Sequence, residues 1–286
     1  MTTATPGSTR STRDGTVGSL LRGWRGRRRI SQLELALRAE SSARHISFIE
    51  TGRARPSQAM VLRLAEHLEV PVRERNALLI AAGYAPVYTE RPLHDPAMAA
   101  LRSQLDSLLA AYEPNPALVV DGSYDVVAAN SGTALLLRGV PDHLLRPPMN
   151  ALRLSLHPEG LAPRIHNLRE WRAHLLERLE RQLALRPSAS LRELHEEVSA
   201  YPVPGGEPDG RQPAGDAYAY ALPLRVELDG RLLSFISTLT TFNTPMDVTV
   251  SELAVETLLP ADPETAQALR AIADDAAARP SHPGEA

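Results

Sequence analysis

Apolar residues recur with the period of an α-helix from residue 17 to residue 83. This spacing predicts five short helices, separated by only a few residues each. Ser31 and Glu34 fit the capping pattern S-x-x-E, in which the serine caps a helix and the glutamate reaches back to it. Gly52 and Gly83 would end helices, because glycine accepts the left-handed conformation that often follows a helix. The first part of the chain is therefore predicted to be a compact all-α domain.

The pattern changes after residue 96, where strand-like runs appear between amphipathic helices. The expected helices are 97–112, 168–185, 191–200 and a short one from Pro263. The expected strands are 116–121, 124–129, 218–228 and 231–242, with 250–259 open to either assignment and 202–215 a Pro/Gly-rich loop. Asp229-Gly230 is a strong two-residue hairpin signal. The second domain is therefore expected to be α+β, built on an antiparallel sheet.

Charge adds to this picture. The chain has 286 residues with 31 basic residues, all of them arginine, and no cysteine. Residues 1–91 hold 15 Arg and 8 acidic residues, and the remainder holds 16 Arg and 26 acidic residues. Without cysteine, zinc fingers, disulfides, iron–sulfur clusters and thiol nucleophiles are excluded. A basic first third joined to an acidic remainder indicates a domain that binds a polyanion and a second domain with another task.

Other classes of protein find no support in the sequence. Its apolar runs are far shorter than the ~20 residues of a membrane span, and residues 1–14 lack the apolar core of a signal peptide. The motifs G-x-S-x-G, H-E-x-x-H, the Walker loop and G-x-G-x-x-G after a strand are missing, so we expect no enzyme and no cofactor. The expectation is a cytoplasmic, nucleoid-associated protein that does not bind membranes.

Two of the predicted helices, on either side of Glu40, have the arrangement of a helix-turn-helix. Leu35, Ala36, Ile46 and Ile49 would pack them together and leave one face of the second helix free for the major groove. The first turn of that helix would contact base edges, with Arg44 donating to guanine O6 and N7, while Gln32, Arg53 and Arg55 would contact phosphates. The candidate DNA-binding residues are Gln32, Ser42, Ala43, Arg44, His45, Phe48, Thr51, Arg53 and Arg55. The alternative is a small helical bundle with a solvated basic face.

These residues resemble the XRE (Cro/C1-type) helix-turn-helix family over about residues 17–83. The resemblance implies a lambda-repressor-like fold and sequence-specific binding to double-stranded DNA. The turn departs from the family pattern, because Glu40 and Ser41 stand where the family usually has glycine followed by an apolar residue. A residue with a side chain costs ~1 kcal/mol at a turn that needs a positive φ, so this turn is expected to be slightly reshaped.

The second domain carries patterns of its own. The strand-like run that ends at Asn130 resembles the opening hairpin of a PAS domain, where an asparagine begins the next helix. The other patterns are Asn150-x-x-Arg153-x-x-x-His157-Pro158, Asn167-x-x-x-Trp171, Leu233-Ser234-Phe235 and Leu259-Pro260-Ala261-Asp262. Together they are similar to the MmyB-like ligand-binding domain over roughly 95–273. The resemblance to MmyB-type transcription regulators of actinobacteria implies a PAS-like domain that accommodates a fatty-acid-like ligand.

The residues alone suggest where such a ligand would bind. Arg153 is the natural partner of an acyl carboxylate because a guanidinium offers two parallel donors. His157, His166 and Trp171 complete the candidate ligand-binding set. Alternatively, Arg153 forms a structural ion pair and Trp171 is a core residue. The spacing of the histidines does not fit metal ligands on a helix, so no metal is expected.

The predicted organisation follows from both resemblances. Its parts are a disordered arm (1–15), an XRE helix-turn-helix domain (16–84), a linker (85–96), a MmyB-like, PAS-like ligand-binding domain (97–275) and a disordered tail (276–286). The leading hypothesis is a homodimeric transcription regulator that binds an operator and senses a small apolar ligand. A second makes the C-terminal domain a ligand-free dimerisation or protein-docking module, which a packed interior without a cavity would favour. A remote third is an enzyme with an accessory basic domain.

Overall fold

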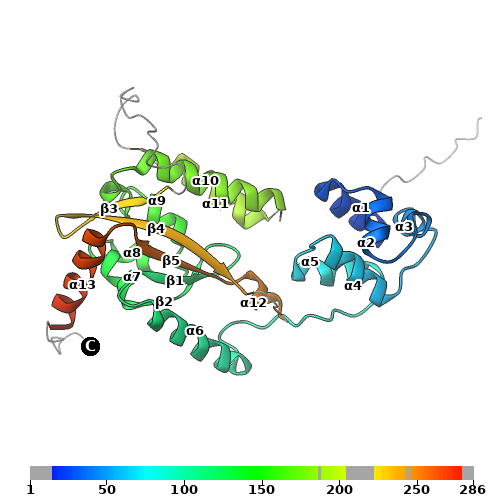
Figure 1. The fold of residues 1–286 in the computed structure, drawn as a ribbon, viewed down its shortest axis with the longest axis horizontal. Helices are drawn as coiled ribbons and strands as arrows, with labels where there is room; N and C mark the ends of the chain where they lie inside the picture. The colour runs from blue at the N-terminus through cyan, green and yellow to red at the C-terminus, as the bar shows by residue number, and fades with distance from the viewer. Residues whose placement is uncertain (1–14, 186–187, 204–221, 243–244, 246, 279–286) are drawn as a thin grey trace, which may run out of the picture. The chain divides into compact units, whose positions relative to one another are not determined.

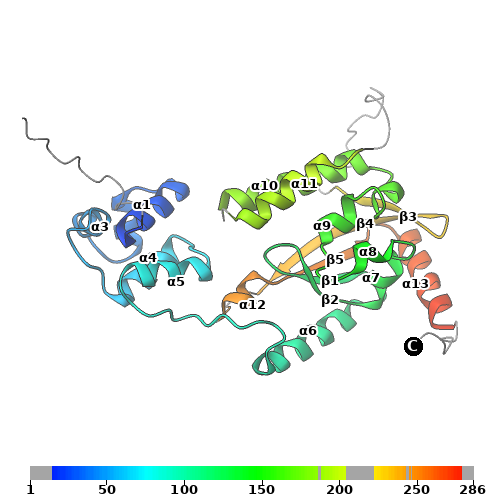
Figure 2. The ribbon, with the colours of Figure 1, turned by 180° about the vertical axis from the view of Figure 1, so that it is seen from behind.

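The computed structural model describes residues 15–185, 188–203, 222–242, 245 and 247–278, drawn in colour in Figures 1 and 2. The chain divides into two compact units, one of residues 1–92 with 243–251 and one of residues 93–242 with 252–286. The expected arm, most of the 202–215 loop, the start of the 218–228 strand and most of the tail lie outside the described residues.

The first unit contains the five expected helices. They are α1 (Val17–Arg28), α2 (Gln32–Arg38), α3 (Ala43–Glu50), α4 (Gln58–His67) and α5 (Val72–Ala81). The first four helices are capped by the side-chain oxygens of Thr16, Ser31, Ser42 and Ser57. Each oxygen accepts a hydrogen bond from the backbone N–H three residues further along the chain. The expectation that Glu34 reaches back to the capping serine is wrong, because its carboxylate pairs with Arg38 one turn further along α2.

The core of this unit is formed where α1 to α5 meet. Leu35, Ala36, Ile46 and Ile49 are each 1 % exposed, so the predicted packing of α2 on α3 is confirmed. Trp24 is buried in the same cluster.

The second unit is built on a five-stranded antiparallel sheet, which confirms the α+β expectation (Figures 1 and 2). The strands are β1 (Ala117–Val120), β2 (Val126–Ala129), β3 (Leu224–Leu228), β4 (Arg231–Thr241) and β5 (Ala254–Pro260), in the spatial order β2-β1-β5-β4-β3. Asp229 and Gly230 join β3 to β4 with φ angles of 49° and 73°, as the turn signal predicts. The ambiguous 250–259 segment divides into the end of a short helix and most of β5.

Helices cover both faces of this sheet. They are α6 (Ala99–Ala111), α7 (Ser131–Leu136), α8 (Asp142–Leu145), α9 (Ala151–Leu156), α10 (Leu168–Leu185), α11 (Ala189–Ala200) and α13 (Pro263–Ala278), with 3-10 turns η1 (Pro96–Met98) and η2 (Ala162–Arg164). A further short helix, α12 (Val248–Glu252), falls almost entirely in the segment 243–251 of the first unit. Asn130 caps α7, as expected where the second strand ends. In both ribbon views α10 and α11 lie side by side along one side of the sheet. None of the helices in the described ranges is long and apolar enough to cross a lipid bilayer.

The second unit has two hydrophobic cores, one on each face of the sheet, because successive side chains along a strand point to opposite faces. Ala117 and Val119 of β1 pack with Val255 of β5 against α6. Leu118 pairs with Glu256 in the ladder between β1 and β5, so both side chains point to the opposite face. That face, covered by α9 and α10, holds the larger core and the pocket described below.

Candidate functional site

The turn between α2 and α3 has the backbone strain that the sequence indicates. Glu40 has a φ angle of 50° and is exposed, whereas the preceding Ala39 is fully buried. The Ser41 N–H donates to the Ala36 carbonyl at 2.8 Å and closes the end of α2. The turn therefore adopts the positive φ that glycine would accept without strain.

The exposed side of α3 gathers most of the candidate DNA-binding residues. Ser42 caps its first turn, and Ala43 packs its small side chain against the core. The Arg44 guanidinium is exposed and lies 5.2 Å from the centre of the Phe48 ring, while His45 Nδ1 lies 3.1 Å from the Ser41 hydroxyl. At the other end Thr51 donates to a helix carbonyl and Arg53 is exposed just beyond it. Arg44 and Arg53 therefore present donors to solvent, on and just beyond a helix that starts at a polar cap.

Gln32, the candidate phosphate contact on α2, is held by a buried carboxylate. Its amide nitrogen donates to Glu50 Oε2 at 2.8 Å. Arg25 of α1 donates to the same carboxylate from two nitrogens, at 2.7 and 3.0 Å, and the Glu50 side chain is only 2 % exposed. Hydrogen bonding to Glu50 raises the pKa of Arg25 against the opposing effect of burial. The network fixes Gln32 at the start of α2 and joins α1, α2 and α3.

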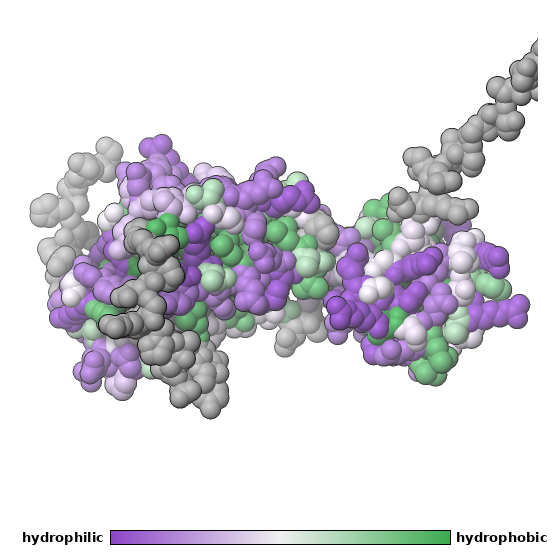
Figure 3. Space-filling model, turned by 90° about the horizontal axis from the view of Figure 1, so that it is seen from above, coloured by the Kyte–Doolittle hydropathy of each residue, from purple (hydrophilic) through white to green (hydrophobic). Residues whose placement is uncertain are grey.

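Arg55 lies apart from the other candidates. Its Nε and Nη2 donate to the Ala82 carbonyl at the end of α5, at 3.2 and 3.1 Å, and its guanidinium lies 5.5 Å from the Tyr84 ring centre. Arg28 similarly donates to the carbonyls of Leu68 and Glu69 after α4. Arg55 and Arg28 therefore close helix ends, whereas Arg44 and Arg53 face solvent. Figure 3 shows one largely hydrophilic face of this unit.

Replacing Glu40 with glycine is expected to raise the free energy of unfolding of the first unit by about 0.5–1 kcal/mol. Relieving the strain of a positive φ stabilises the folded state by about 1–2 kcal/mol. Glycine also increases the conformational freedom of the unfolded chain, which offsets part of this stabilisation. Urea denaturation followed by tryptophan emission measures the difference. Glu40→Ala removes the same charge but keeps a Cβ, so a gain of equal size in both variants would contradict the backbone explanation.

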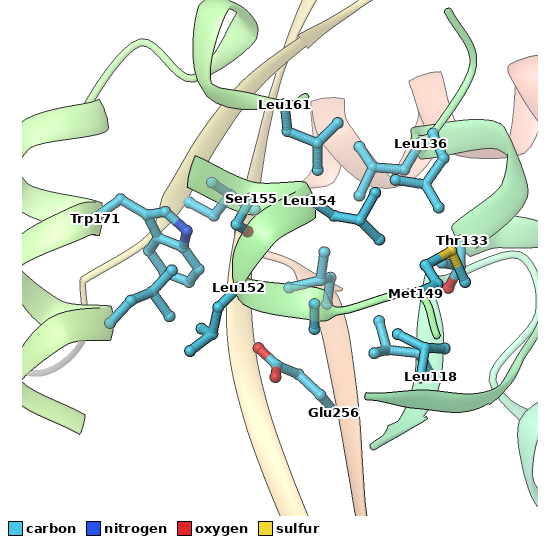
Figure 4. Close-up of a pocket in the computed structure, with 16 residues that line it drawn as sticks. Leu118, Thr133, Leu136, Met149, Leu152, Leu154, Ser155, Leu161, Trp171 and Glu256 are labelled. Carbon is cyan, nitrogen blue, oxygen red and sulfur yellow. The ribbon is translucent and has the colours of Figure 1, made fainter. Parts of the chain in front are cut away.

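An apolar pocket lies between the sheet and the helices of the second unit (Figure 4). Its volume is about 60 Å³. The lining comes from β1, β2, β3, β5, α7, α9, α10 and the loops beside them, and consists of Leu118, Val126, Thr133, Leu136, Leu137, Met149, Ala151, Leu152, Leu154, Ser155, Leu161, Trp171, Leu175, Leu224, Glu256 and Leu258. Apart from Thr133, Ser155 and Glu256, these residues are apolar. The pocket suits an aliphatic molecule with few polar groups.

Glu256 is the ionisable residue in this lining, and its charge is already paired. Arg178 of α10 donates to Oε2 at 3.0 Å, and the Ser237 hydroxyl donates to Oε1 at 3.0 Å. The two charged side chains are 17 % and 11 % exposed. Burial alone would lower the pKa of Arg178, but Glu256 and Tyr124 more than offset it, so this pKa is raised. Arg178 is thereby committed to Glu256, and no other cation is among the described residues that line the pocket.

Of the four candidate ligand-binding residues, Trp171 lines the pocket and the other three lie outside it. Arg153 donates to both oxygens of Glu197 on α11, which agrees with the alternative that it forms a structural ion pair. This hydrogen bonding lowers the pKa of Glu197. His166 lies 3.1 Å from Glu227, and His157 stacks edge-on with Tyr201.

Sequence reasoning missed Ser155 and Glu256. Glu256 lies within 250–259, where the pattern did not separate strand from helix, so the face on which its side chain would lie stayed undefined. Within the described ranges, no three His, Asp or Glu side chains are grouped so that they would hold a metal ion.

Comparison with known families agrees with this geometry. A family model described as a helix-turn-helix domain matches residues 16–78. A second, described as the MmyB-like transcription regulator ligand binding domain, matches residues 101–272. A search among curated proteins gave no significant match. The two matches define a DNA-binding transcription regulator that carries a ligand-binding domain. More specifically, since the second match spans over half of the sequence, the chain belongs to the MmyB-like transcription regulator ligand-binding family.

Proposed function

We propose that the chain is a homodimeric regulator whose binding to a specific operator is controlled by a small apolar, fatty-acid-like molecule in the pocket of Figure 4. The observation that carries this proposal is an aliphatic cavity inside a domain joined to a helix-turn-helix. Such a protein acts where the chromosome is, in the cytoplasm at the nucleoid. The ligand acts non-covalently, and neither catalysis nor a cofactor is required.

The DNA half of the proposal rests on α3. Its capped first turn and exposed Arg44 would enter the major groove, while Gln32 and Arg53 contact phosphates on either side. In a dimer the two α3 helices would meet successive major grooves about 34 Å apart. The operator is then a two-fold symmetric sequence.

The size of the cavity supports control by the ligand. Pockets for drug-sized ligands are roughly 300–1,000 Å³, whereas this one is about 60 Å³. A larger ligand must therefore push apart the leucines that α7, α9 and α10 contribute. Ligand-bound and ligand-free states would then differ in packing, and a ligand that prefers one state shifts the balance between them. A cavity at this position also argues against the packed interior expected of a ligand-free docking module.

Native mass spectrometry of the freshly purified full chain, with a solvent extract of the denatured protein, tests the ligand half. The expected result is a dimer with additional mass that is extracted as an aliphatic compound. An empty protein whose melting temperature is unchanged by a panel of lipids would instead favour the docking module.

Arg44→Ala is expected to weaken binding to the selected operator by about 1–3 kcal/mol and to relax its sequence preference, because a bidentate contact to guanine is lost. Arg53→Ala should weaken binding to every sequence alike, because a phosphate contact carries no sequence information. Fluorescence anisotropy with an operator obtained by in vitro selection and with random DNA measures both effects. Equal losses on both DNAs for both variants would show that Arg44 does not contact bases.

A further inference from the structure

One polar atom in the pocket has no partner. The indole of Trp171 is 2 % exposed, and its Nε1–H makes no hydrogen bond with any described residue. Buried donors are nearly always paired, since leaving one unpaired costs about 1–3 kcal/mol. The proposed function leaves this donor unexplained.

The position of this donor points to a ligand. In Figure 4 the indole nitrogen points toward the part of the pocket where α9 presents the Ser155 hydroxyl. The described structure gives this hydroxyl no hydrogen-bond partner either. An acceptor atom placed between the two side chains would receive one hydrogen bond from each. Glu256 enters the pocket from the sheet, and its carboxylate accepts from Arg178 and Ser237.

The charges of the lining restrict what this acceptor is. Among the described residues that line the pocket there is no arginine or histidine, and the acidic group is the carboxylate of Glu256. Arg178, the nearby cation, is committed to that carboxylate. A buried anionic head group would therefore lack a counter-charge and lie near a like charge, which is costly.

We propose that Trp171 and Ser155 form the head-group site of the pocket, and that this site takes an uncharged acceptor such as the carbonyl of an ester, ketone or amide on an aliphatic chain. The free carboxylate of a fatty acid is thereby disfavoured. This inference rests on the proposed function, because it names the head group of the ligand that the pocket would sense.

Three probes with the same aliphatic tail test the inference on the full chain at pH 7.5: methyl octanoate, octanoate and octane. Calorimetry or thermal shift should show the ester binding at least about tenfold more tightly than the carboxylate, and more tightly than octane. In Trp171→Phe, affinity for the ester should fall about three- to tenfold, the value of one hydrogen bond, while octane binding stays the same. Ser155→Ala should reduce ester affinity in the same direction.

Tryptophan emission gives an independent readout, since the chain has only two tryptophans. In a Trp24→Phe protein the emission comes from Trp171, and it should change with methyl octanoate more than with octane. Tighter binding of octanoate than of the ester, or an ester affinity unchanged in Trp171→Phe, would overturn the head-group site. Equal binding of octane and ester would also overturn the head-group site, but it would still agree with the proposed sensor of an apolar ligand. Failure of all three probes to bind would contradict both the head-group site and the proposed sensor.

Discussion

Replacing Arg178 with methionine is expected to lower the free energy of unfolding of the second unit by about 3–5 kcal/mol. The substitution leaves the Glu256 carboxylate buried without its cation, and removing one partner of a buried ion pair has an effect of this size. The Ser237 hydroxyl alone would remain as a hydrogen-bond donor to this carboxylate. Urea denaturation of a Trp24→Phe background, with emission from Trp171, follows this unit separately from the first one.

The same helix provides a matched control. Arg181 pairs with Glu177 on α10, but these side chains are 58 % and 66 % exposed. Exposed pairs of this kind contribute about 0.3–0.5 kcal/mol, so Arg181→Met should be nearly silent. The double variant Arg178→Met with Glu256→Leu should recover much of the lost stability, because an apolar pair of similar volume removes the unpaired charge. Equal, small losses for Arg178→Met and Arg181→Met would show that the buried pair does not hold β5 to α10.

Elements that are determined by local interactions were predicted well from the sequence. The range predicted for α10, residues 168–185, agrees with the structure because its apolar stripe persists for five turns. Ser31, the predicted cap of α2, acts within four residues of its partner. The candidate DNA-binding residues also come mainly from one short stretch, which explains how a single motif gathers them.

Two predictions fail or fall short for physical reasons. Helical spacing predicts that Leu33 and Leu37 lie with Ala36 on the buried face of α2, but they are 60 % and 72 % exposed, whereas Leu35 is buried. A helix of only seven residues has two neighbouring apolar stripes, and periodicity does not choose between them.

The pocket illustrates a second limit. Arg153 has the right chemistry for a carboxylate ligand, but Glu197 lies 44 positions later and takes up its charge. Trp171 and Glu256 are brought to one pocket from α10 and β5 only by the fold. Contacts at such separations leave no mark in the local pattern, so the sequence indicated a ligand-binding domain without locating most of the residues around its ligand.

Glu50→Ala is expected to have an equally large effect in the first unit. Its carboxylate is almost fully buried and accepts from Arg25 and Gln32, so alanine leaves a partly buried guanidinium without its counter-charge. A loss of about 3–5 kcal/mol in the free energy of unfolding follows from breaking such a pair. Operator binding should fall with it, since Gln32 loses the group that holds it at the start of α2. Thermal unfolding of a Trp171→Phe background reports on this unit through Trp24.

Two further variants, Glu34→Ala and Gln32→Ala, distinguish an effect on stability from an effect on DNA binding. Glu34 also pairs with an arginine, but the side chains are 45 % and 48 % exposed, so its removal should change stability by about 0.5 kcal/mol or less. Gln32→Ala keeps the ion pair between Arg25 and Glu50, and should therefore weaken DNA binding with a much smaller loss of stability. If Glu50→Ala unfolds at the same temperature as Glu34→Ala, the buried network does not join α1, α2 and α3. If Gln32→Ala binds every DNA as well as the unaltered protein, this side chain is a structural partner of Glu50 and not a phosphate contact.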